Sequence, residues 1–385
     1  MITLGFCIFT EGDRVRARLV MSMFSIAVLS CLATACAGDA GSGAAGAPRE
    51  VRVSCTGGDA DAATLQHAID SSSPGAGISI TGTCLLIRGI TLLGGRTYAG
   101  ASTAGTVLRQ RGRMSYVLAS AGYVADFATT GDPLAIRDLT IACDGSGSTD
   151  GIIVVAWQAD VQHVDVSHCG GSGIVDTSIT ANGQAITNTS VNSRFDDNFI
   201  SGSGGYGFEV SDGRHAVTDG YLDGNQIASS AKDAIYLQTA AGWDVSGNHL
   251  YGDGQDGISA ASMYGTTISD NYIEDFGSRQ SSGTWYGIVG TVQANVGSAI
   301  SGNKISNDGG EVPGARHVYV AVTRASGGAG YLSVTGNVII GARTADIGFS
   351  FSGRPSRLVV ASSGNEVAGV GTARRTSDAT LTSGM

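Results

Sequence analysis

The chain has 385 residues, among them 59 Gly and 5 Pro, and only 15% of its residues are charged. Its formal net charge of −10 excludes the clustered basic surface that nucleic-acid binding requires. The abundance of Gly with Ser, Thr, Asn, Asp, Val and Ile predicts many short strands joined by tight turns, and long amphipathic helices are almost absent.

Residues 1–36 are expected to be a targeting segment. A basic stretch, "DRVRARLV", leads into the apolar run "VMSMFSIAVLSCLATAC", an order typical of export signals. The end of this run resembles a bacterial lipoprotein box, in which Cys36 would carry the lipid and residues 37–49 would form a flexible tether. Simple secretion after cleavage at Ala35 is the alternative. We expect an exported protein that touches a membrane only through such an anchor.

One short phrase recurs along most of the chain, Val/Ile-x-x-Asn-x-Ile/Leu/Val. Its asparagines are separated by 23, 23, 32, 34 and 28 residues and are Asn225, Asn248, Asn271, Asn303, Asn337 and Asn365. Upstream, the same frame fits "IRDLTI", "VQHVDV" and "ITNTSV", where Leu139, Val164 and Thr189 replace Asn. A period of this size indicates a solenoid, and the absence of helix signals makes each repeat one coil of parallel strands.

Each coil is expected to hold a second strand. The segments that predict it are "DGIIVV", "SGIVDT", "YGFEVS", "DAIYLQ", "DGISAA", "YGIVGT" and "HVYVAV", which begin at Asp150, Ser172, Tyr206, Asp233, Asp256, Tyr286 and His317. Stacking of like residues from coil to coil would bury a continuous core. The repeated Asn are interpreted as structural, because their amides can bond backbone groups and one another at a bend.

This pattern resembles the right-handed parallel β-helix of the pectate-lyase-like superfamily, over about residues 50–371. The resemblance implies an all-β solenoid and a short N-terminal capping helix, for which Leu65, Ala68 and Ile69 supply an apolar face. Residues 372–385 lack a core pattern and are expected to be a loose tail. The superfamily implies a carbohydrate substrate without fixing a mechanism, because the motifs of polygalacturonases, alginate epimerases and pectate lyases are missing.

Four cysteines follow the targeting segment, which suggests two disulfides in an exported protein. Three pairings are possible. Separations of 29 and 26 residues, close to one coil, favour Cys55–Cys84 and Cys143–Cys169.

Coils of unequal length predict a groove. Extra residues at 192–207, 274–287 and 306–317 would wall a flat stretch formed by the two short coils between them. The strands beneath the groove would be residues 207–210, 234–237, 257–260, 287–290 and 317–320. If Phe208, Ile235, Ile258, Ile288 and Val318 face the core, alternation turns Glu209, Tyr236, Ser259, Val289 and Tyr319 to solvent.

Acidic and aromatic residues in this groove suit a sugar chain. The candidate catalytic residues are Glu209, Asp233 and Asp256, with His215 as a possible base. The candidate substrate-binding residues are Tyr236, Trp285, Arg316, Tyr319 and Arg194. Asp233 and Asp256 have a structural alternative as turn residues that bond the local backbone. No cofactor is expected, although the hard oxygens of "RFDDN" could bind Ca²⁺.

Two functions fit these features. One is an extracellular enzyme that acts on a polysaccharide by lyase or glycoside hydrolase chemistry. The other is a non-catalytic cell-surface module that binds glycan or protein partners. The sequence leaves the oligomeric state open.

Overall fold

The computed structural model describes residues 50–307, 314–325, 327–354 and 357–383. The predicted export signal, Cys36 and the tether lie outside the described residues. Within those ranges, no helix has both the length and the apolar character needed to cross a membrane.

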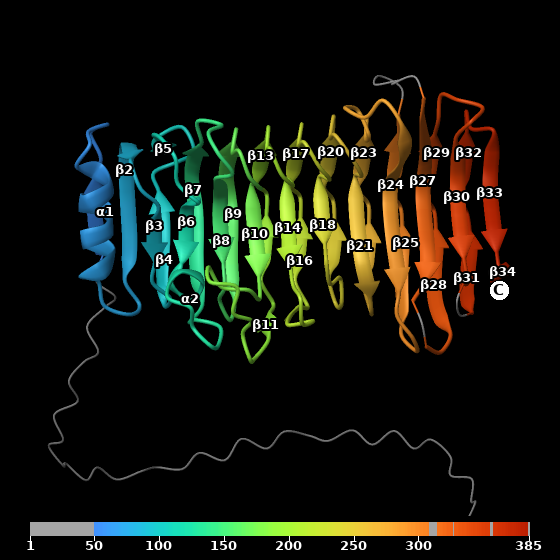
Figure 1. Ribbon diagram of the computed structural model, residues 1–385, viewed down its shortest axis with the longest axis horizontal. Helices are drawn as coiled ribbons and strands as arrows, with labels where there is room; N and C mark the ends of the chain where they lie inside the picture. The colour runs from blue at the N-terminus through green and yellow to red at the C-terminus, as the bar shows by residue number, and fades with distance from the viewer. Residues whose placement is uncertain (1–49, 308–313, 326, 355–356, 384–385) are drawn as a thin grey trace, which may run out of the picture. The chain divides into compact units, whose positions relative to one another are not determined.

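The described chain winds into stacked coils that follow one another in sequence order along the long axis (Figure 1). All of the strand pairings between coils are parallel within the described residues. One sheet of eleven strands there consists of β3 (Ile90–Leu92), β6 (Tyr116–Ser120), β8 (Asp150–Val154), β10 (Ile174–Thr177), β14 (Phe208–Ser211), β18 (Ile235–Leu237), β21 (Ile258–Met263), β24 (Gly283–Val292), β27 (Ala315–Arg324), β30 (Ile347–Ser352) and β33 (Thr372–Ser377). All of the segments that the sequence predicted as the second strand of a coil lie in this sheet.

The other large sheet bends around the remaining sides of the coils. In the described residues its 21 strands are β1 (Glu50–Ser54), β2 (Gly77–Leu86), β4 (Arg96–Gly100), β5 (Thr106–Gln110), β7 (Leu134–Ala142), β9 (Ala159–Ser167), β12 (Arg194–Asp196), β13 (Phe199–Ser201), β16 (Tyr221–Asp223), β17 (Gln226–Ala228), β19 (Asp244–Ser246), β20 (His249–Tyr251), β22 (Thr267–Ser269), β23 (Tyr272–Glu274), β25 (Gly297–Ser301), β26 (Lys304–Ser306), β28 (Gly330–Thr335), β29 (Val338–Ile340), β31 (Leu358–Ser363), β32 (Glu366–Ala368) and β34 (Ala379–Ser383). From β12 onward most coils contribute two of these strands, one on each side of a bend.

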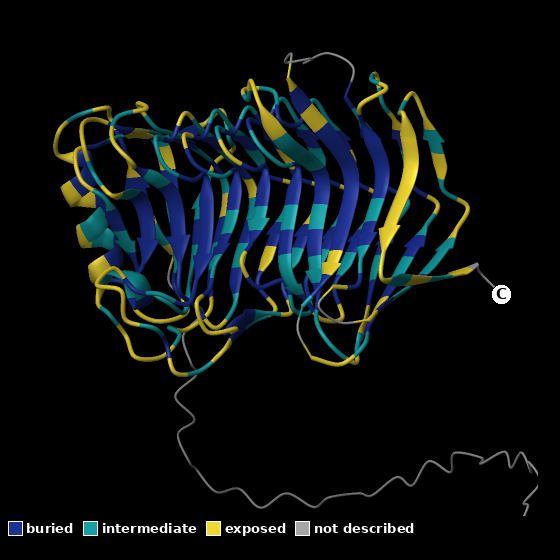
Figure 2. Cartoon of the chain, turned by 45° about the vertical axis from the view of Figure 1, so that its right-hand side comes forward, coloured by how far each residue is buried: buried dark blue, intermediate teal, exposed yellow. Residues whose placement is uncertain are grey.

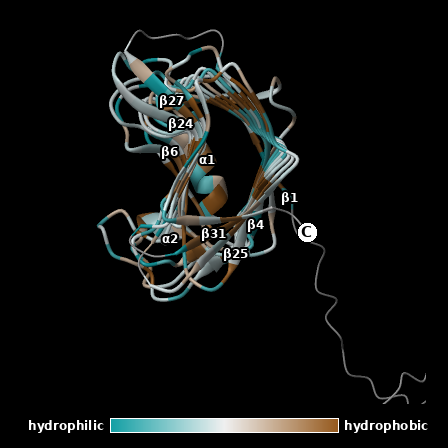
Figure 3. Ribbon diagram, turned by 90° about the vertical axis from the view of Figure 1, so that its right-hand side faces the viewer, coloured by the Kyte–Doolittle hydropathy of each residue, from teal (hydrophilic) through white to brown (hydrophobic). Residues whose placement is uncertain are grey.

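The core is the inside of the tube. Buried apolar residues of both large sheets form one cluster inside it. The strands that carry them are coloured hydrophobic around the tube (Figure 3) and are buried along most of their length (Figure 2). Phe195, Phe208 and Trp243 pack together in the middle, with ring centroids 4.7 to 6.4 Å apart. Stacking of successive coils therefore buries what one coil would leave exposed.

The predicted helix covers the first coil. Helix α1 (Asp61–Asp70) lies at the N-terminal end of the solenoid (Figure 1), and its Leu65 and Ile69 are fully buried against the core. It closes an end that would otherwise expose apolar side chains. The second helix in the described residues, α2 (Ala121–Val124), is a single turn after β6.

The repeated asparagines form a continuous ladder at the bend of the 21-stranded sheet. The side-chain amide of each Asn donates to Oδ1 of the Asn in the next coil over 2.9 to 3.0 Å, and the backbone N–H of each Asn donates to the same Oδ1. The second amide hydrogen bonds a backbone carbonyl, as from Asn271 to Val245. The structural interpretation of these residues is confirmed.

The first rung of the ladder corrects one alignment. The backbone N–H of Val164 donates to Oδ1 of Asn198, so Asn198 occupies the position that we assigned to Thr189. The coil from Val164 to the next ladder position is therefore 34 residues long, not the 25 residues that an alignment on Thr189 gives. Residues around Thr189 instead enter a small two-stranded sheet of β11 (Ser190–Val191) and β15 (Val217–Thr218). An insertion after β10 displaced the repeat, and a fixed period could not show it.

The backbone conformation just before each ladder Asn explains why Gly or Asp occupies that position. The chain turns at this position with positive φ, between 55° and 68°, at Asp197, Gly224, Gly247, Asp270, Gly302, Gly336 and Gly364. Glycine adopts this left-handed conformation without steric cost, and Asp tolerates it better than most residues. The recurring phrase Gly/Asp-Asn is thus one bend repeated in every coil.

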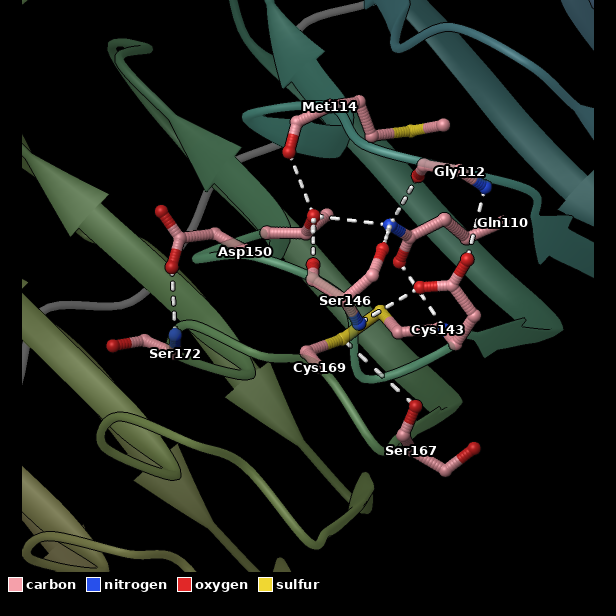
Figure 4. Close-up of a disulfide and its surroundings, with 11 residues drawn as sticks. Gln110, Gly112, Met114, Cys143, Ser146, Asp150, Ser167, Cys169 and Ser172 are labelled. Atoms are coloured by element: carbon pink, nitrogen blue, oxygen red, sulfur yellow. Dashed lines mark hydrogen bonds between the residues drawn. A yellow bond between two sulfur atoms is a disulfide. The ribbon is translucent and has the colours of Figure 1, made fainter.

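Both predicted disulfides are present. Cys55 pairs with Cys84 and Cys143 pairs with Cys169, with Cα–Cα distances of 4.8 Å in each case. The second bond ties the end of β7 to the turn after β9 in the next coil (Figure 4). Beside it, the Gln110 amide donates to Thr149 and to the carbonyl of Gly112. This cross-link therefore fixes the turns that lead into β8 and β10.

Replacing both Cys143 and Cys169 with alanine is expected to lower the free energy of unfolding by about 3 kcal/mol. The bond closes a loop of 26 residues, and its loss frees that loop in the unfolded chain. Urea unfolding of the oxidised wild type and the double variant measures the difference. Dithiothreitol should destabilise the wild type more than the variant, and equal sensitivity would contradict the assignment.

The C-terminal segment differs from our expectation. Residues 372–377 and 379–383 form β33 and β34, which pair with β30 and β31 instead of hanging loose. The side chains of β33 are all exposed, and Ala379 and Leu381 of β34 are only partly buried against the core, so no clear core pattern marks these residues in the sequence. Backbone pairing with the open edge of the preceding coil is sufficient to order them.

Candidate functional site

The outer face of the eleven-stranded sheet presents an ordered column of polar side chains. The core residues Ile152, Ile174, Phe208, Ile235, Ile258 and Ile288 are in register across β8, β10, β14, β18, β21 and β24. Two positions before them stand Asp150, Ser172, Tyr206, Asp233, Asp256 and Tyr286. One position after them, Glu209, Tyr236 and Ser259 lie side by side. We call Asp150, Glu209, Asp233 and Asp256 the carboxylate row.

The N-terminal part of the row is linked through one serine. The hydroxyl of Ser172 donates to Oε2 of Glu209 over 2.7 Å, and the backbone N–H of Ser172 donates to Oδ1 of Asp150 over 2.6 Å (Figure 4 shows the latter). Ser172 is buried, so it holds both acids from beneath. The bond from Ser172 therefore fixes the orientation of the Glu209 side chain. In the part of the chain that the structure describes, its other oxygen, Oε1, remains free to interact with water or substrate.

The C-terminal part of the row is linked through the backbone. Oδ1 of Asp233 accepts the N–H of Asp256 over 3.0 Å, and Oδ1 of Asp256 accepts the N–H of Tyr286 over 2.8 Å. One oxygen of each carboxyl thus ties one coil to the next, in line with the structural alternative for these residues. Within the described residues, the second oxygen of each accepts no hydrogen bond, and it remains available to a ligand.

Burial raises the pKa of three of these carboxyls toward neutral pH. It raises the pKa of Asp150 to about 6 and that of Asp233 to about 6. For Asp256 it acts together with the negative charge of Asp233 and raises the pKa to about 7. Two neighbouring carboxyls that resist ionising together are suited to donate a proton.

Tyrosine rings complete the face. Tyr206 and Tyr236 stack with centroids 4.6 Å apart and an angle of 14° between the rings. Burial, and then the nearby carboxylates, raise the pKa of Tyr206 to about 12 and also raise that of Tyr236. The ammonium of Lys232 lies 4.5 Å from the centre of the Tyr206 ring. Both phenols therefore stay protonated and offer apolar faces with hydroxyl donors.

The raised pKa of Asp256 predicts a pH effect on stability. A carboxyl whose pKa is higher in the folded state favours folding at low pH, and this contribution is lost as pH rises through the folded-state value. The free energy of unfolding should therefore decrease between about pH 4 and about pH 7 because of Asp256. Asp256→Asn should make this slope shallower.

Urea unfolding at several pH values measures the slope for the wild type and the variant. Buried Asp176 and Asp253, whose pKa is raised to about 8 in each case, keep part of the slope in both proteins. Asp223→Asn, at an exposed position of the other sheet, is the matched control. An unchanged slope in Asp256→Asn would contradict the prediction.

One outward assignment is wrong. In the register of β24 and β27, Ile288 lies opposite Val320, not Val318. The sequence alignment therefore placed the residues of β27 two positions away from their true partners in β24. Tyr319 is fully buried and packs against Phe276, with centroids 5.5 Å apart, while Val318 lies on the outer side with Tyr286 and Val289. Tyr319 follows Gly287 in the stack, where a side chain would collide with Ile305 and with the Tyr319 carbonyl.

The remaining candidates lie apart from the row. Arg194 is on β12 of the other sheet, 4.1 Å from the Tyr221 ring. His215 lies in the exposed turn beyond β14, with Nδ1 3.3 Å from the Thr239 hydroxyl. Trp285 is partly buried against the core and donates to the carbonyl of Ser282. Arg316 is exposed on β27 opposite Thr284, at the C-terminal margin of the face.

The predicted groove walls are only partly in place. Residues 194–196 and 199–201 form β12 and β13 of the other sheet, so the first predicted wall is wrong. The extra residues of that coil are residues 178–193, which follow β10 and include β11 (Figure 1). A loop does precede β24 at residues 275–282, and half of the third segment, residues 308–313, lies outside the described residues.

Sequence reasoning missed Asp150, Ser172, Tyr206 and Lys232. Asp150 carried a signal, because it begins "DGII" as Asp233 begins "DAIY" and Asp256 begins "DGIS". The other three have no such mark. Their role depends on the strand order, which places them next to Glu209 and Asp233. Among the described residues, no group of three or more His, Cys, Asp or Glu has the arrangement of a metal site.

Comparison with known proteins agrees with this architecture. A family model described as a right handed beta helix region matches residues 150–339. The chain is a right-handed parallel β-helix protein. No curated protein sequence matches it.

Solved structures share the β-helix. The mannuronan C-5 epimerase AlgE6 A-module of Azotobacter vinelandii superposes with a TM-score of 0.59 at 15% identity, over 86% of this chain and 97% of that one. The AlgE4 A-module of the same organism gives 0.57 at 16% identity, over 86% and 97%. The Dettilon tailspike protein gives 0.53 at 12% identity, over 80% of this chain and 64% of the tailspike. At these identities the likeness shows the fold.

Proposed function

We propose that this β-helix protein is an enzyme that binds a polysaccharide along the outer face of the eleven-stranded sheet and hydrolyses its glycosidic bonds. The observation that carries the proposal is the carboxylate row, in which Glu209 and the pair Asp233 and Asp256, whose pKa values are raised, stand beside stacked tyrosines. Glycoside hydrolysis needs one acid that gives a proton and one carboxylate that takes one. The names of the epimerase modules, which act on mannuronan, support a carbohydrate ligand by analogy of fold.

In this proposal the roles follow from the environments. The Asp233–Asp256 pair gives its proton to the glycosidic oxygen as the bond from that oxygen to the anomeric carbon breaks. Glu209, held by Ser172, takes a proton from the water whose oxygen bonds to the anomeric carbon. The stacked Tyr206 and Tyr236 support the sugar rings.

Hydrolysis fits the face better than a lyase reaction. A lyase removes a carbon-bound proton and needs a base, yet the raised pKa values of Tyr206 and Tyr236 keep these phenols protonated. His215 and Arg316, the alternative base and the candidate partner for a uronate, lie beyond the strand end and at the margin. Neither is part of the row.

A non-catalytic glycan-binding module is the second candidate. One observation favours it: Asp150, Asp233 and Asp256 each use an oxygen to bond the backbone of the next coil. If these acids serve only to connect neighbouring coils, the face could bind a glycan without cleaving it.

Product analysis separates these candidates. The chain from residue 37 onward is incubated with acidic and neutral polysaccharides, with and without Ca²⁺, and the products are weighed by mass spectrometry. Shortened chains with an added water are expected. Unsaturated ends would replace the hydrolase with a lyase, and binding without cleavage would favour the module.

We also propose that the protein is exported, as the targeting segment predicts and the two disulfides support. Lipid attachment at Cys36 is part of this proposal. Metabolic labelling with a fatty acid should mark the wild type and not Cys36→Ser, whereas labelling of neither would indicate simple secretion.

A further inference from the structure

We propose that the carboxylate row selects a polysaccharide without acidic groups and discriminates against uronate chains. This inference rests on the proposed function, since it names the substrate class of the same face. It separates this chain from the structural relatives whose name specifies mannuronan, a uronate polymer.

The first argument is the charge on the face. Four acids gather along five consecutive strands, β8 to β21: Asp150 begins β8, Glu209 lies on β14, and Asp233 and Asp256 lie in the turns just before β18 and β21. Lys232 directly precedes Asp233. Its charge acts on Asp150 and Asp233, and its ammonium lies over the Tyr206 ring.

The second argument is the position of the other cations. A uronate chain carries one carboxylate on every sugar, so several cations along the groove are needed to bind it. Arg194 lies on the other large sheet against Tyr221. Arg214 and His215 lie in the turn beyond β14, and Arg316 lies beyond Asp256 at one end. An acidic chain along the row would pass the four carboxyl groups and would be repelled by those that are ionised.

The third argument is what the row offers an uncharged sugar. The second oxygens of Asp150, Asp233 and Asp256 can accept hydrogen bonds from hydroxyl groups, which every neutral sugar supplies. Tyr206 and Tyr236 add an aromatic surface for the C–H faces of the ring. A uronate polymer has the same hydroxyl groups, but its carboxylates are repelled by the row. We therefore expect a uronate polymer to bind more than about tenfold more weakly than its neutral counterpart at neutral pH.

The test compares matched polymers that differ only in charge. The pairs are polygalacturonate with its methyl ester, and alginate and hyaluronan with their carboxyl-reduced forms. Binding to the intact chain is measured by titration calorimetry at neutral pH, with EDTA and again with Ca²⁺. The expected result is binding to at least one neutral polymer that exceeds binding to its acidic partner by more than about tenfold.

Two outcomes would overturn the inference in different ways. Equal or tighter binding of an acidic polymer, with EDTA or with Ca²⁺, would reject the selection and leave polysaccharide binding intact. Failure of every polymer to bind would reject the proposed function, and the inference with it.

Charge variants test the cause. Asp150→Asn removes one acid of the row without touching Glu209 or the Asp233–Asp256 pair, and should strengthen acidic-polymer binding several-fold. Asp223→Asn makes the same change of net charge on the other sheet and should have no effect. Equal effects of both variants would show that the net charge of the protein, not the row, determines the affinity for acidic polymers, and this result would overturn the inference. Circular dichroism confirms that both variants are folded.

Discussion

Asn271→Ala is expected to lower the free energy of unfolding by about 3 kcal/mol, because it opens the middle of the asparagine ladder. Oδ1 of Asn271 accepts two donors from Asn248, its backbone N–H and its amide, and the Asn271 amide donates to the carbonyl of Val245. Alanine leaves these groups buried and unpaired. Each unpaired buried group costs about 1–3 kcal/mol.

The matched control for this variant is Asn365→Ala at the far end of the ladder. Asn365 is partly exposed, so water can replace the bonds that it makes to Asn337 and Val334. Urea unfolding should show a clearly smaller loss there. If the two variants lose equal stability, the ladder does not act through buried hydrogen bonds.

Glu209→Gln is expected to lower kcat by about 10²–10⁴-fold on a substrate that the wild type cleaves. Glutamine has the shape of glutamate and can still accept the Ser172 hydroxyl, so the face keeps its structure. It cannot take the proton of the attacking water. Steady-state kinetics on the substrate found by product analysis measures the effect, and KM should change much less than kcat.

Glu366→Gln provides the same substitution on β32 of the other large sheet, where the side chain is exposed. It should keep wild-type turnover. Full activity of Glu209→Gln would remove Glu209 from the mechanism. A large loss in both variants would point to a general effect on the fold instead of chemistry at the row.

The sequence predicted the architecture because the repeat is a local pattern with a physical cause. From Asn198 onward each coil has a left-handed residue and then an amide at the same bend, so Gly or Asp followed by Asn returns with each turn. The second strands, the cap helix and both disulfides follow from this period and from apolar alternation. Glu209 could be identified as outward-facing because alternation along one strand is a local property.

The membership of the site depended on how the coils align, which only the tertiary structure decided. An insertion after β10 put Asn198, not Thr189, in the ladder, and a shift of two residues turned Tyr319 into the core. Stacking across coils brought Asp150 and Ser172 beside Glu209, although they lie 59 and 37 residues from it in sequence. The raised pKa values of Asp233 and Asp256 have the same origin. They depend on burial and on a neighbouring charge, and both arise only when separate coils pack together.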